Sequence, residues 1–384
     1  MSGTPAASPG VESDAKGGPA SGSDAPAVGI VGAGAVALGT AAWLHEAGHR
    51  PVLWSPSGAS TAGFAAGDPL IVDGVVETRF APAFATSAAE LAQGCDVLVL
   101  ALPAYGHAFV MDALAPHVDD SHTVVISSHA SFGALYLSRL LAARGVTVPI
   151  VAWGTTLVTG RRGEAGRLTV NTVRARIDLC TVPDSASARG AALCRSLFGE
   201  RFVERDGLLA IALSNLNPQN HMGIALCNMT RMEHGERWSQ GRNVTPNVGR
   251  LLEALDAERL AIAGALGLEV RTIFEHFHLS FHVPEASVSD MNAQMHADGR
   301  GGTGPATADS RYVTEDVPYG LLPTVLLGDL VDRPATLHRA GVDVFSAMYG
   351  RDFAAENTLL GALELDALPL ERLRQLAKTG YTST

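Results

Sequence analysis

The chain has 384 residues, of which 47% are hydrophobic and 17% are charged, and its formal net charge is −11. This length allows two domains of ordinary size, and the composition indicates packed cores rather than disorder. No block of Lys or Arg interrupts the acidic balance, which argues against nucleic acid and anionic membranes as partners.

The first residues differ in composition from the rest of the chain. Residues 1–26 are mostly small, polar or turn-forming, so we expect a disordered tail there rather than a signal peptide. No run approaches the ~18 apolar residues that a membrane span needs. The cysteines are too widely spaced for a paired metal motif, and we expect buried thiols in a reducing, cytoplasmic compartment. They are Cys95, Cys180, Cys194 and Cys227.

A glycine-rich motif follows the tail. The apolar run Val28–Val31 suits a buried parallel strand, and Gly32, Gly34 and Ala37 after it form a G-x-G-x-x-A pattern that opens a helix. The first glycine permits a tight turn, the second lets a pyrophosphate approach the helix N-terminus, and the alanine keeps helix and sheet close. This order predicts a Rossmann dinucleotide site. Its loop also contains Ala35 and Val36.

The end of the second strand, "PVLWS", bears on the choice between NAD and NADP. An Asp or Glu there would bind the ribose hydroxyls of NAD and repel a 2′-phosphate. Here the strand ends in Ser55, and Ser57 follows shortly after. We therefore predict a preference for NADP(H), with NAD(H) as the alternative. The nearest cation in the sequence, Arg50, lies at the other end of the strand.

Further strands predict an α/β domain over residues 27–206. "DVLVLALPAYGH" and "VPIVAWGTT" place Leu102, Pro103 and Thr156 at carboxyl ends of strands, where ligands collect in a parallel sheet. A strand-end hydroxyl with an ordinary backbone partner is the alternative for Thr156. "LIVDGVVETRF" predicts a hairpin, and "RLTVNTVRARIDLCTV" predicts antiparallel edge strands. The expected fold class is an α/β N-terminal Rossmann domain with a mostly parallel sheet.

From residue 207 to 384 the apolar periodicity is mostly helical, which predicts an all-α second domain and an active site in the cleft between the domains. In "NPQNHMGIALCN" a helix would place Asn217, His221 and Asn228 on one face. A catalytic histidine and a buried histidine bound to a carbonyl both fit this pattern.

A second histidine group, "FEHFHLSFH", contains His276, His278 and His282. No Cys, Asp or Glu completes a recognisable metal site, so we expect these residues to pack against the core and expect no metal.

The stretch "SRYVTEDVPYGLLP" brings several charges together after "ADGRGGTGPATADS", a segment that we expect to be too glycine-rich to pack. A solvated surface loop is one interpretation. The other is a mobile loop that brings Arg311 and Asp316 to a site.

The chain resembles the opine dehydrogenases, the octopine/nopaline dehydrogenase family, in "GAGAVAL", "LALPAYGH", "NPQNH", "RYVTEDVPYGL" and "GRDFAAENTLLGALELDAL". The resemblance implies NAD(P)H-dependent condensation of an amino acid, or another amine, with a 2-oxo acid by hydride transfer to an imine. It also implies a catalytic pair of His221 and Asp316, with Glu315 as the alternative partner, and Arg311 as the group that holds a substrate carboxylate. Asn217 and Thr156 are further expected substrate contacts.

Two other functions are compatible with the two-domain plan. A ketopantoate or 2-hydroxy-acid reductase would need no amine, but such enzymes usually use a lysine, and neither Lys16 nor Lys378 is well placed. A non-catalytic NADP-binding protein would not need both His221 and Asp316. We expect small-molecule substrates and a homodimer.

Overall fold

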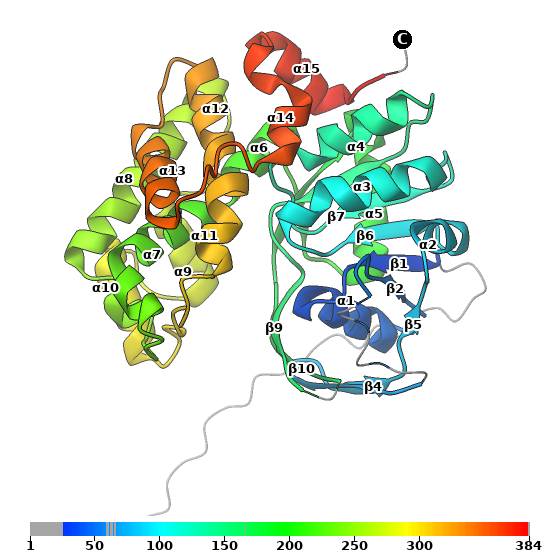
Figure 1. Cartoon of the computed structure of the whole chain (residues 1–384), viewed down its shortest axis with the longest axis horizontal. Coiled ribbons are helices and arrows are strands. Elements are labelled where there is room, and N and C mark those ends of the chain that lie inside the picture. Colours follow the sequence, from blue (N-terminus) through cyan, green and yellow to red (C-terminus); the bar gives the residue numbers. More distant parts are fainter. Residues whose placement is uncertain (1–25, 59–60, 62–63, 65–66, 165, 383–384) are drawn as a thin grey trace, which may run out of the picture.

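The computed structural model describes residues 26–58, 61, 64, 67–164 and 166–382. The predicted tail, residues 1–26, lies outside the described residues except for its last position. A sheet with helices forms one half of the molecule and a group of helices forms the other, as Figure 1 shows. The predicted fold class, a Rossmann half followed by a helical half, is confirmed.

The main sheet has eight strands in the order β12-β11-β8-β7-β6-β1-β2-β5. Neighbouring strands are parallel except at the β11–β8 pair, so the sheet is mostly parallel, as predicted. Every residue of β1, β6, β7 and β8 is buried, because helices cover both faces, which explains their continuous apolar runs. The strands are β1 (Val28–Val31), β2 (Val52–Trp54), β5 (Ala83–Phe84), β6 (Val97–Leu100), β7 (Thr123–Ile126), β8 (Ile150–Trp153), β11 (Ile177–Val182) and β12 (Phe202–Glu204).

Two apolar cores flank this sheet. One contains residues of α1 and α5, and the other contains residues of α2, α3 and α4. The helices are α1 (Ala35–Glu46), α2 (Ala88–Gly94), α3 (His107–Leu114), α4 (Gly133–Ala142) and α5 (Ser187–Phe198). The carboxyl ends of the parallel strands remain open between these layers, which is where ligands bind in such sheets.

A smaller sheet has the order β4-β3-β10-β9. Its strands are β3 (Leu70–Gly74), β4 (Thr78–Phe80), β9 (Val158–Arg162) and β10 (Arg167–Val173). The predicted Asp-Gly hairpin is the antiparallel pair β3–β4. The prediction for "RLTVNTVRARIDLCTV" was partly wrong: β10 joins this second sheet, and β11 is antiparallel but lies inside β12 in the main sheet.

Strand β9 lies directly against helix α1. A Cβ at Gly39 would come within 2.7 Å of Val158 Cγ2, so a side chain there would push the strand away. The same packing places Arg162, at the end of β9, beside the glycine-rich loop that precedes α1.

The described elements after β12 are all helical. They are α6 (Gly207–Ser214), α7 (Asn217–Glu233), α8 (Pro246–Leu266), α9 (Ile273–Phe281), α10 (Val288–Ala297), α11 (Arg311–Thr314), the π-helical turn η5 (Val317–Leu321), α12 (Leu322–Leu330), α13 (Thr336–Tyr349), α14 (Thr358–Leu363) and α15 (Leu370–Thr379), together with short 3-10 turns.

The helical half does not pack as one separate body. Leu252 and Phe345 belong to a core of its own, whereas Leu208, Leu359 and Leu373, from α6, α14 and α15, share the core of the main sheet. Figure 1 shows α14 and α15 above α4. A domain boundary between residues 206 and 207 therefore stays a prediction.

The glycine-rich segment before α11 packs closely, so the prediction that it could not pack was wrong. The amide of Gly241 donates to the carbonyl of Gly301 at 2.8 Å, and a Cβ at Gly304 would lie 2.2 Å from Trp238 Cζ2. The glycines permit this approach because they have no side chain.

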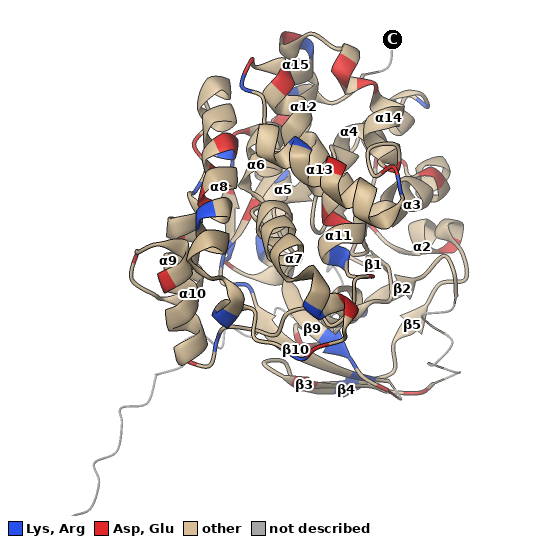
Figure 2. Cartoon of the chain, turned by 60° about the vertical axis from the view of Figure 1, so that its left-hand side comes forward, with Lys and Arg blue, Asp and Glu red and all other residues tan. Residues whose placement is uncertain are grey.

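Charged residues of both signs are spread over the elements rather than gathered on one face (Figure 2). Cys95, Cys180 and Cys194 are buried, but Cys227 on α7 is exposed, contrary to our expectation. Within the described ranges, no helix combines the length and apolarity required to cross a membrane.

Candidate active site

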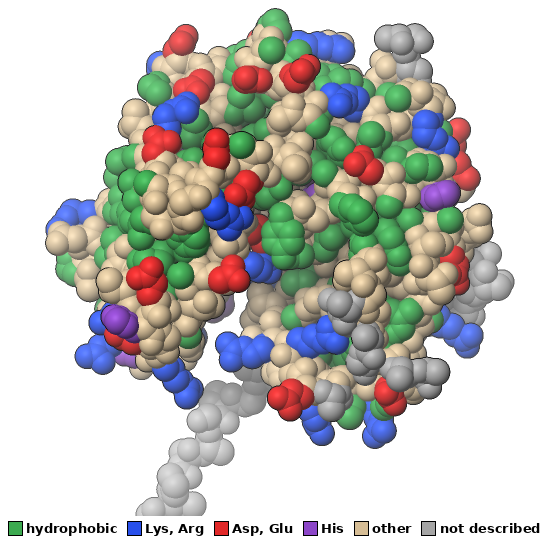
Figure 3. Space-filling view, in the orientation of Figure 1, with side chains coloured by type: hydrophobic (Ala, Val, Ile, Leu, Met, Phe, Trp, Pro, Cys, Tyr) green, Lys and Arg blue, Asp and Glu red, His purple; other side chains and the backbone are tan. Residues whose placement is uncertain are grey.

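A pocket of about 1030 Å³ opens between the two halves of the molecule, where the space-filling view in Figure 3 shows a hollow. It runs along the carboxyl ends of β1, β2, β6, β7 and β8. All but one of the predicted site residues line it: Gly32, Gly34, Ala35, Val36, Ser55, Ser57, Leu102, Pro103, Thr156, Asn217, His221, Arg311 and Asp316. The exception, Ala37, is fully buried beneath the loop.

The glycine-rich loop has the form that a dinucleotide pyrophosphate requires. Gly32 has φ of +122°, and a Cβ on it would lie 2.5 Å from the carbonyl oxygen of Ala101. Gly34 precedes α1, and a Cβ there would meet nothing within 4 Å, so the space above it is open to the pocket. The free amides at the start of α1 can bind phosphate oxygens in that space. The residues present therefore fit a dinucleotide.

Arg162, which we did not predict from the sequence, places a positive charge beside this loop. Arg162 Nη1 donates to the carbonyl oxygen of Ala33 at 3.2 Å, and its guanidinium lies 5.4 Å from the ring centroid of Phe64. In the part of the chain that the structure describes, no carboxylate pairs with it. Ser55 and Ser57 line the pocket near this loop, whereas Arg162 contacts the loop without being one of the residues that line the pocket. No local pattern marks Arg162, because it reaches the loop only through the packing of β9 on α1.

His221 and Asp316 meet at the other end of the pocket. Nδ1 of His221 lies 2.7 Å from Oδ2 of Asp316, and the two side chains are 20% and 19% exposed. The imidazole is stacked on Tyr312, with ring centroids 3.6 Å apart and planes inclined by 9°. Burial, followed by the charge of Asp316, raises the pKa of Tyr312 to about 12, so its hydroxyl stays protonated. With Nδ1 engaged by the carboxylate, Nε2 is the nitrogen available for proton transfer.

The elements that carry this pair are held in close contact. A Cβ at Gly320 in η5 would lie 2.3 Å from Cγ of Pro218 in the first turn of α7. Asn357 Nδ2 donates to the carbonyl oxygen of Pro318 at 2.7 Å and to Ser131 Oγ at 2.8 Å. These buried hydrogen bonds join η5 to the loop after β7, so the pair is fixed relative to the Rossmann half.

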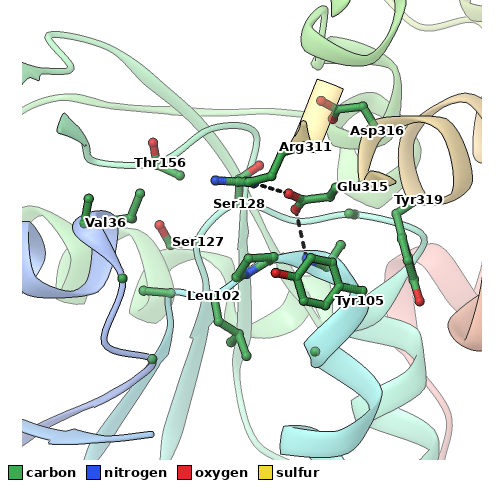
Figure 4. Close-up of a pocket in the computed structure, with 18 of the residues that line it drawn as sticks. Val36, Leu102, Tyr105, Ser127, Ser128, Thr156, Arg311, Glu315, Asp316 and Tyr319 are labelled. Carbon is green, nitrogen blue, oxygen red and sulfur yellow. Dashed lines mark hydrogen bonds and ion pairs between the residues drawn. The ribbon is translucent and has the colours of Figure 1, made fainter. Parts of the chain in front are cut away.

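Glu315 points away from His221. Its Oε1 accepts a hydrogen bond from the amide of Ala104 at 2.9 Å, and its Oε2 accepts one from Arg311 Nε. Figure 4 shows Arg311 extending over Ser128, with Glu315 between it and the segment that carries Tyr105. Asp316 is therefore the carboxylate on the imidazole.

The charge of Arg311 is firmly held. Burial lowers the pKa of its guanidinium, but the charge and hydrogen bond of Glu315, together with the charges of Asp316 and Tyr105, outweigh burial, and the net direction is upward. The segment that carries it is helical, so our description of it as a loop was wrong. A short helix and a π-helical turn position Arg311, Glu315 and Asp316.

Other predicted residues take simpler positions. Thr156 Oγ1 donates to the carbonyl oxygen of Val158 at 2.9 Å, the ordinary alternative considered above, although Thr156 also lines the pocket. Asn217 is exposed at the start of α7. Asn228 does not share the pocket face: α7 kinks there, with φ of −128°, and Asn228 Nδ2 donates to the carbonyl oxygen of Ile224 at 2.9 Å.

The second histidine group shows no metal geometry. His276 packs near the rings of Phe277 and Phe281, and Nδ1 of His278 lies 2.8 Å from the carbonyl oxygen of Val283. Across the residues with described positions, no group of three or more His, Cys, Asp or Glu side chains is arranged to hold a metal ion.

Comparison with known proteins gives two family matches. Residues 204–349 match the NAD/NADP octopine/nopaline dehydrogenase alpha-helical domain, and residues 28–172 match ketopantoate reductase PanE/ApbA. The opine dehydrogenase of Arthrobacter sp. (strain 1C) is 30% identical over 283 residues, which cover 73% of this chain and 78% of that protein.

Solved structures agree on the fold. Octopine dehydrogenase in complex with NADH and agmatine superposes with a TM-score of 0.74 at 16% identity, covering 92% of this chain and 99% of the other. Yersinopine dehydrogenase with NADP+ gives a TM-score of 0.65 at 16% identity, covering 88% and 98%. The chain belongs to the opine dehydrogenase family, whose members are NAD(P)-dependent oxidoreductases that act on CH–NH bonds.

Proposed function

We propose that the protein condenses the amine of an amino acid, or a related amine, with a 2-oxo acid and reduces the resulting imine with NADPH. The observation that carries the proposal is the His221–Asp316 pair, which faces the same pocket as the dinucleotide cradle. Reduced nicotinamide, when bound, supplies the hydride. The side chains of the pocket must then bind two substrates and move protons between them.

His221 is the proposed proton donor and acceptor. Imine formation requires deprotonation of the substrate amine and loss of water from the condensed intermediate, and an imidazole can serve both steps near neutral pH. Asp316 at Nδ1 keeps the ring in the tautomer that leaves Nε2 for the substrate, and it stabilises the imidazolium. The stacked ring of Tyr312 restricts rotation of the imidazole.

Arg311 is the proposed binding group for one substrate carboxylate. Its Nε is held by Glu315, which leaves the terminal nitrogens for a two-pronged contact with a carboxylate. Structures of octopine dehydrogenase contain NADH with L-arginine, agmatine or pyruvate, which supports an amine and a 2-oxo acid as the substrate classes here.

For the cofactor we propose a preference for NADPH over NADH. Ser55 and Ser57 replace the carboxylate that would repel a 2′-phosphate, and Arg162 adds a positive charge beside Ala33. Both nucleotides occur among similar proteins, since the octopine dehydrogenase complex contains NADH and the yersinopine dehydrogenase complex contains NADP+.

The decisive test is oxidation of NADPH with a panel of 2-oxo acids, each with and without a panel of amino acids. We expect turnover only when both substrates are present. Equal turnover with the 2-oxo acid alone would favour a hydroxy-acid reductase instead. Lys378 does not line the pocket and lies 3.7 Å from Asp206, so it does not supply the lysine expected of that class.

A further inference from the structure

The pocket contains an arginine with no role in the proposed mechanism. Arg174 lies between β10 and β11 and lines the pocket near Thr155 and Thr156. Among the described residues its guanidinium makes no hydrogen bond, ion pair or aromatic contact, and its Nε is buried without a partner. Burial lowers its pKa, and no neighbouring carboxylate counters that effect. An unpaired, partly buried guanidinium is costly, which points to a missing anion.

Three other arginines on this side of the molecule are paired with carboxylates. Arg259 Nη2 lies 2.7 Å from Asp256 Oδ1, and both Arg205 and Arg271 contact Asp178, at 2.9 and 3.3 Å. These carboxylates are thus already engaged by other cations, and none of them pairs with Arg174.

The pKa of His276 reflects its burial and the positive charge of Arg174. Burial lowers its pKa to about 4, and the charge of Arg174 is the next cause, followed by Arg271 and Arg259, while Asp256 opposes them. The histidine is therefore neutral near pH 7 and does not add to the charge. Arg174 is thus a positive charge on the wall of the pocket with no carboxylate paired to it among the described residues, and an anion placed there would be stabilised.

We propose that Arg174 binds the carboxylate of one substrate while Arg311 binds that of the other. This inference rests on the proposed function, because a product made from an amino acid and a 2-oxo acid carries a carboxylate from each precursor. Arg311 lies on α11, where Glu315 shares its charge, and Arg174 lies beside Leu157 on a different wall. The two cations would hold the substrates at separate positions with His221 in the same pocket.

The backbone of Arg174 can be maintained without its guanidinium. Its amide donates to the carbonyl oxygen of Leu157 at 2.8 Å, and its own carbonyl accepts from Arg201 Nη1 at 2.7 Å. Arg174→Gln should therefore keep the fold. Arg176, two residues further along the same connection, is exposed and does not line the pocket, so Arg176→Gln is the matched control for general loss of charge.

The kinetic test uses the full chain with NADPH, pyruvate and an amino acid that supports turnover. For Arg174→Gln we expect KM for one carboxylate substrate to rise at least ~10-fold, as for loss of a hydrogen bond to a charged group. KM for NADPH and kcat should change little. Arg174→Lys should recover part of the loss, and Arg176→Gln should behave like the unmodified protein.

Substrate truncation identifies which carboxylate is bound. The amino acid is replaced by the amine that lacks its carboxylate. If Arg174 holds the amino-acid carboxylate, Arg174→Gln and the unmodified protein become equal with the amine. If it holds the 2-oxo acid, the rise in KM for pyruvate persists with the amine. Either result supports the proposal, and an unchanged KM for both substrates overturns it.

A binding measurement separates this inference from the proposed function. Calorimetry of pyruvate, oxamate and the amino acid, each added to the protein with NADPH, needs no turnover. Weaker binding of one carboxylate by Arg174→Gln alone would support the assignment even if condensation were never observed. Equal dissociation constants in the unmodified protein, Arg174→Gln and Arg176→Gln would refute it.

Discussion

The imidazole of His221 lies flat against the phenol ring of Tyr312, with ring centroids 3.6 Å apart and planes inclined by 9°. Asp316 contacts the same imidazole at Nδ1. The stacking on Tyr312 therefore restricts the plane of the ring, and the contact with Asp316 restricts its rotation within that plane. Tyr312 in turn donates from its hydroxyl to Gln240 Oε1 at 2.7 Å. The histidine is thus oriented without a substrate, and such an orientation would lower the entropic cost of the proton transfer that we propose for it.

Changes at Tyr312 test the stacked contact. Tyr312→Phe keeps the ring and loses only the hydrogen bond to Gln240, so we expect kcat to fall less than ~10-fold. Tyr312→Leu removes the flat surface, lets the imidazole rotate, and should lower kcat by ~10- to 100-fold. Steady-state kinetics of both variants, with circular dichroism to verify folding, measure the difference. Identical kcat in the two variants would show that the ring contributes nothing beyond bulk.

His221 and Asp316 should act as one unit. His221→Ala and Asp316→Ala are each expected to lower kcat by at least ~100-fold, the usual scale of general acid–base catalysis. The double variant should be scarcely slower than His221→Ala, because the carboxylate acts only through the imidazole. A folded Asp316→Ala protein with near-normal turnover would contradict the proposed pair.

Arg311 should affect substrate binding more than chemistry. Arg311→Lys keeps a positive charge but loses both the two-pronged contact and the contact through Nε to Glu315. We expect KM for one carboxylate substrate to rise ~10-fold or more while the dissociation constant for NADPH stays unchanged. Kinetics with varied substrate, and NADPH titration by fluorescence, provide the two values. A loss confined to NADPH affinity would place Arg311 in the cofactor site instead.

The cofactor preference depends on groups at Ser55 and Arg162. We expect the unmodified protein to have the higher kcat/KM with NADPH. Ser55→Asp should shift the preference towards NADH by repelling the 2′-phosphate. Arg162→Gln should raise KM for NADPH by at least ~10-fold and leave KM for NADH nearly unchanged.

The neighbouring Arg161 provides the control for the cofactor test. Arg161 is exposed on the same strand and pairs in register with Thr169, so Arg161→Gln removes an equal charge without removing the hydrogen bond that Arg162 makes to the loop. We expect normal kinetics with both nucleotides. If Arg162→Gln weakened NADPH and NADH equally, the arginine would act on the pyrophosphate or on the loop itself, and the assignment to the 2′-phosphate would fail.

Buried histidines should make the fold sensitive to acid. His107 and His129 are almost fully buried; burial lowers the pKa of His107 to about 4 and, together with the charge of His107, that of His129 to about 3. In the unfolded chain both should titrate near ~6.5. Below that pH the two histidines are protonated in the unfolded chain but stay neutral in the folded chain. The free energy of unfolding therefore falls as the pH decreases from ~6.5 towards 4. For His107 this loss amounts to about 3 kcal/mol.

His129→Leu tests this acid sensitivity. Among the described residues neither ring nitrogen of His129 has a hydrogen-bond partner, so the change removes a titrating group without breaking a bond. We expect stability at pH 7.5 to be kept and the decline between pH 6.5 and 4 to become shallower. Urea unfolding at several pH values measures this, with the exposed His117→Gln as control. Parallel pH profiles for all three proteins would contradict the expectation.

The sequence predicted the Rossmann site well because its signals are local. Gly32, Gly34 and Ala37 stand at fixed offsets between a strand and a helix, and each has a physical reason that needs no tertiary information. His221 and Asp316 are different, since 95 positions separate them. No local pattern joins them, and only the resemblance to a family indicated the pair.

Residues whose positions depend on packing between distant segments could not be predicted from the sequence. Arg162 reaches the glycine-rich loop because β9 packs on α1, and Arg174 reaches the pocket from the connection that follows β10 in the second sheet. Tyr312 was inside a motif but carried no sign of its stacking partner. Asn228 shows the opposite error: helical spacing placed it on one face with Asn217 and His221, but α7 kinks at Asn228, and its side chain is buried and bonded to the carbonyl of Ile224.

Gly320 lies at the contact between α7, which carries His221, and η5, which follows Asp316. Because Gly320 has no side chain, its backbone packs directly on the ring of Pro218, and the histidine of α7 and the aspartate just before η5 come into bonding range. Any other residue at this position would push η5 and Pro218 apart, and we expect that shift to lengthen the hydrogen bond between His221 and Asp316. The distance between His221 and Asp316 therefore depends on a residue that contributes no side chain to the pair.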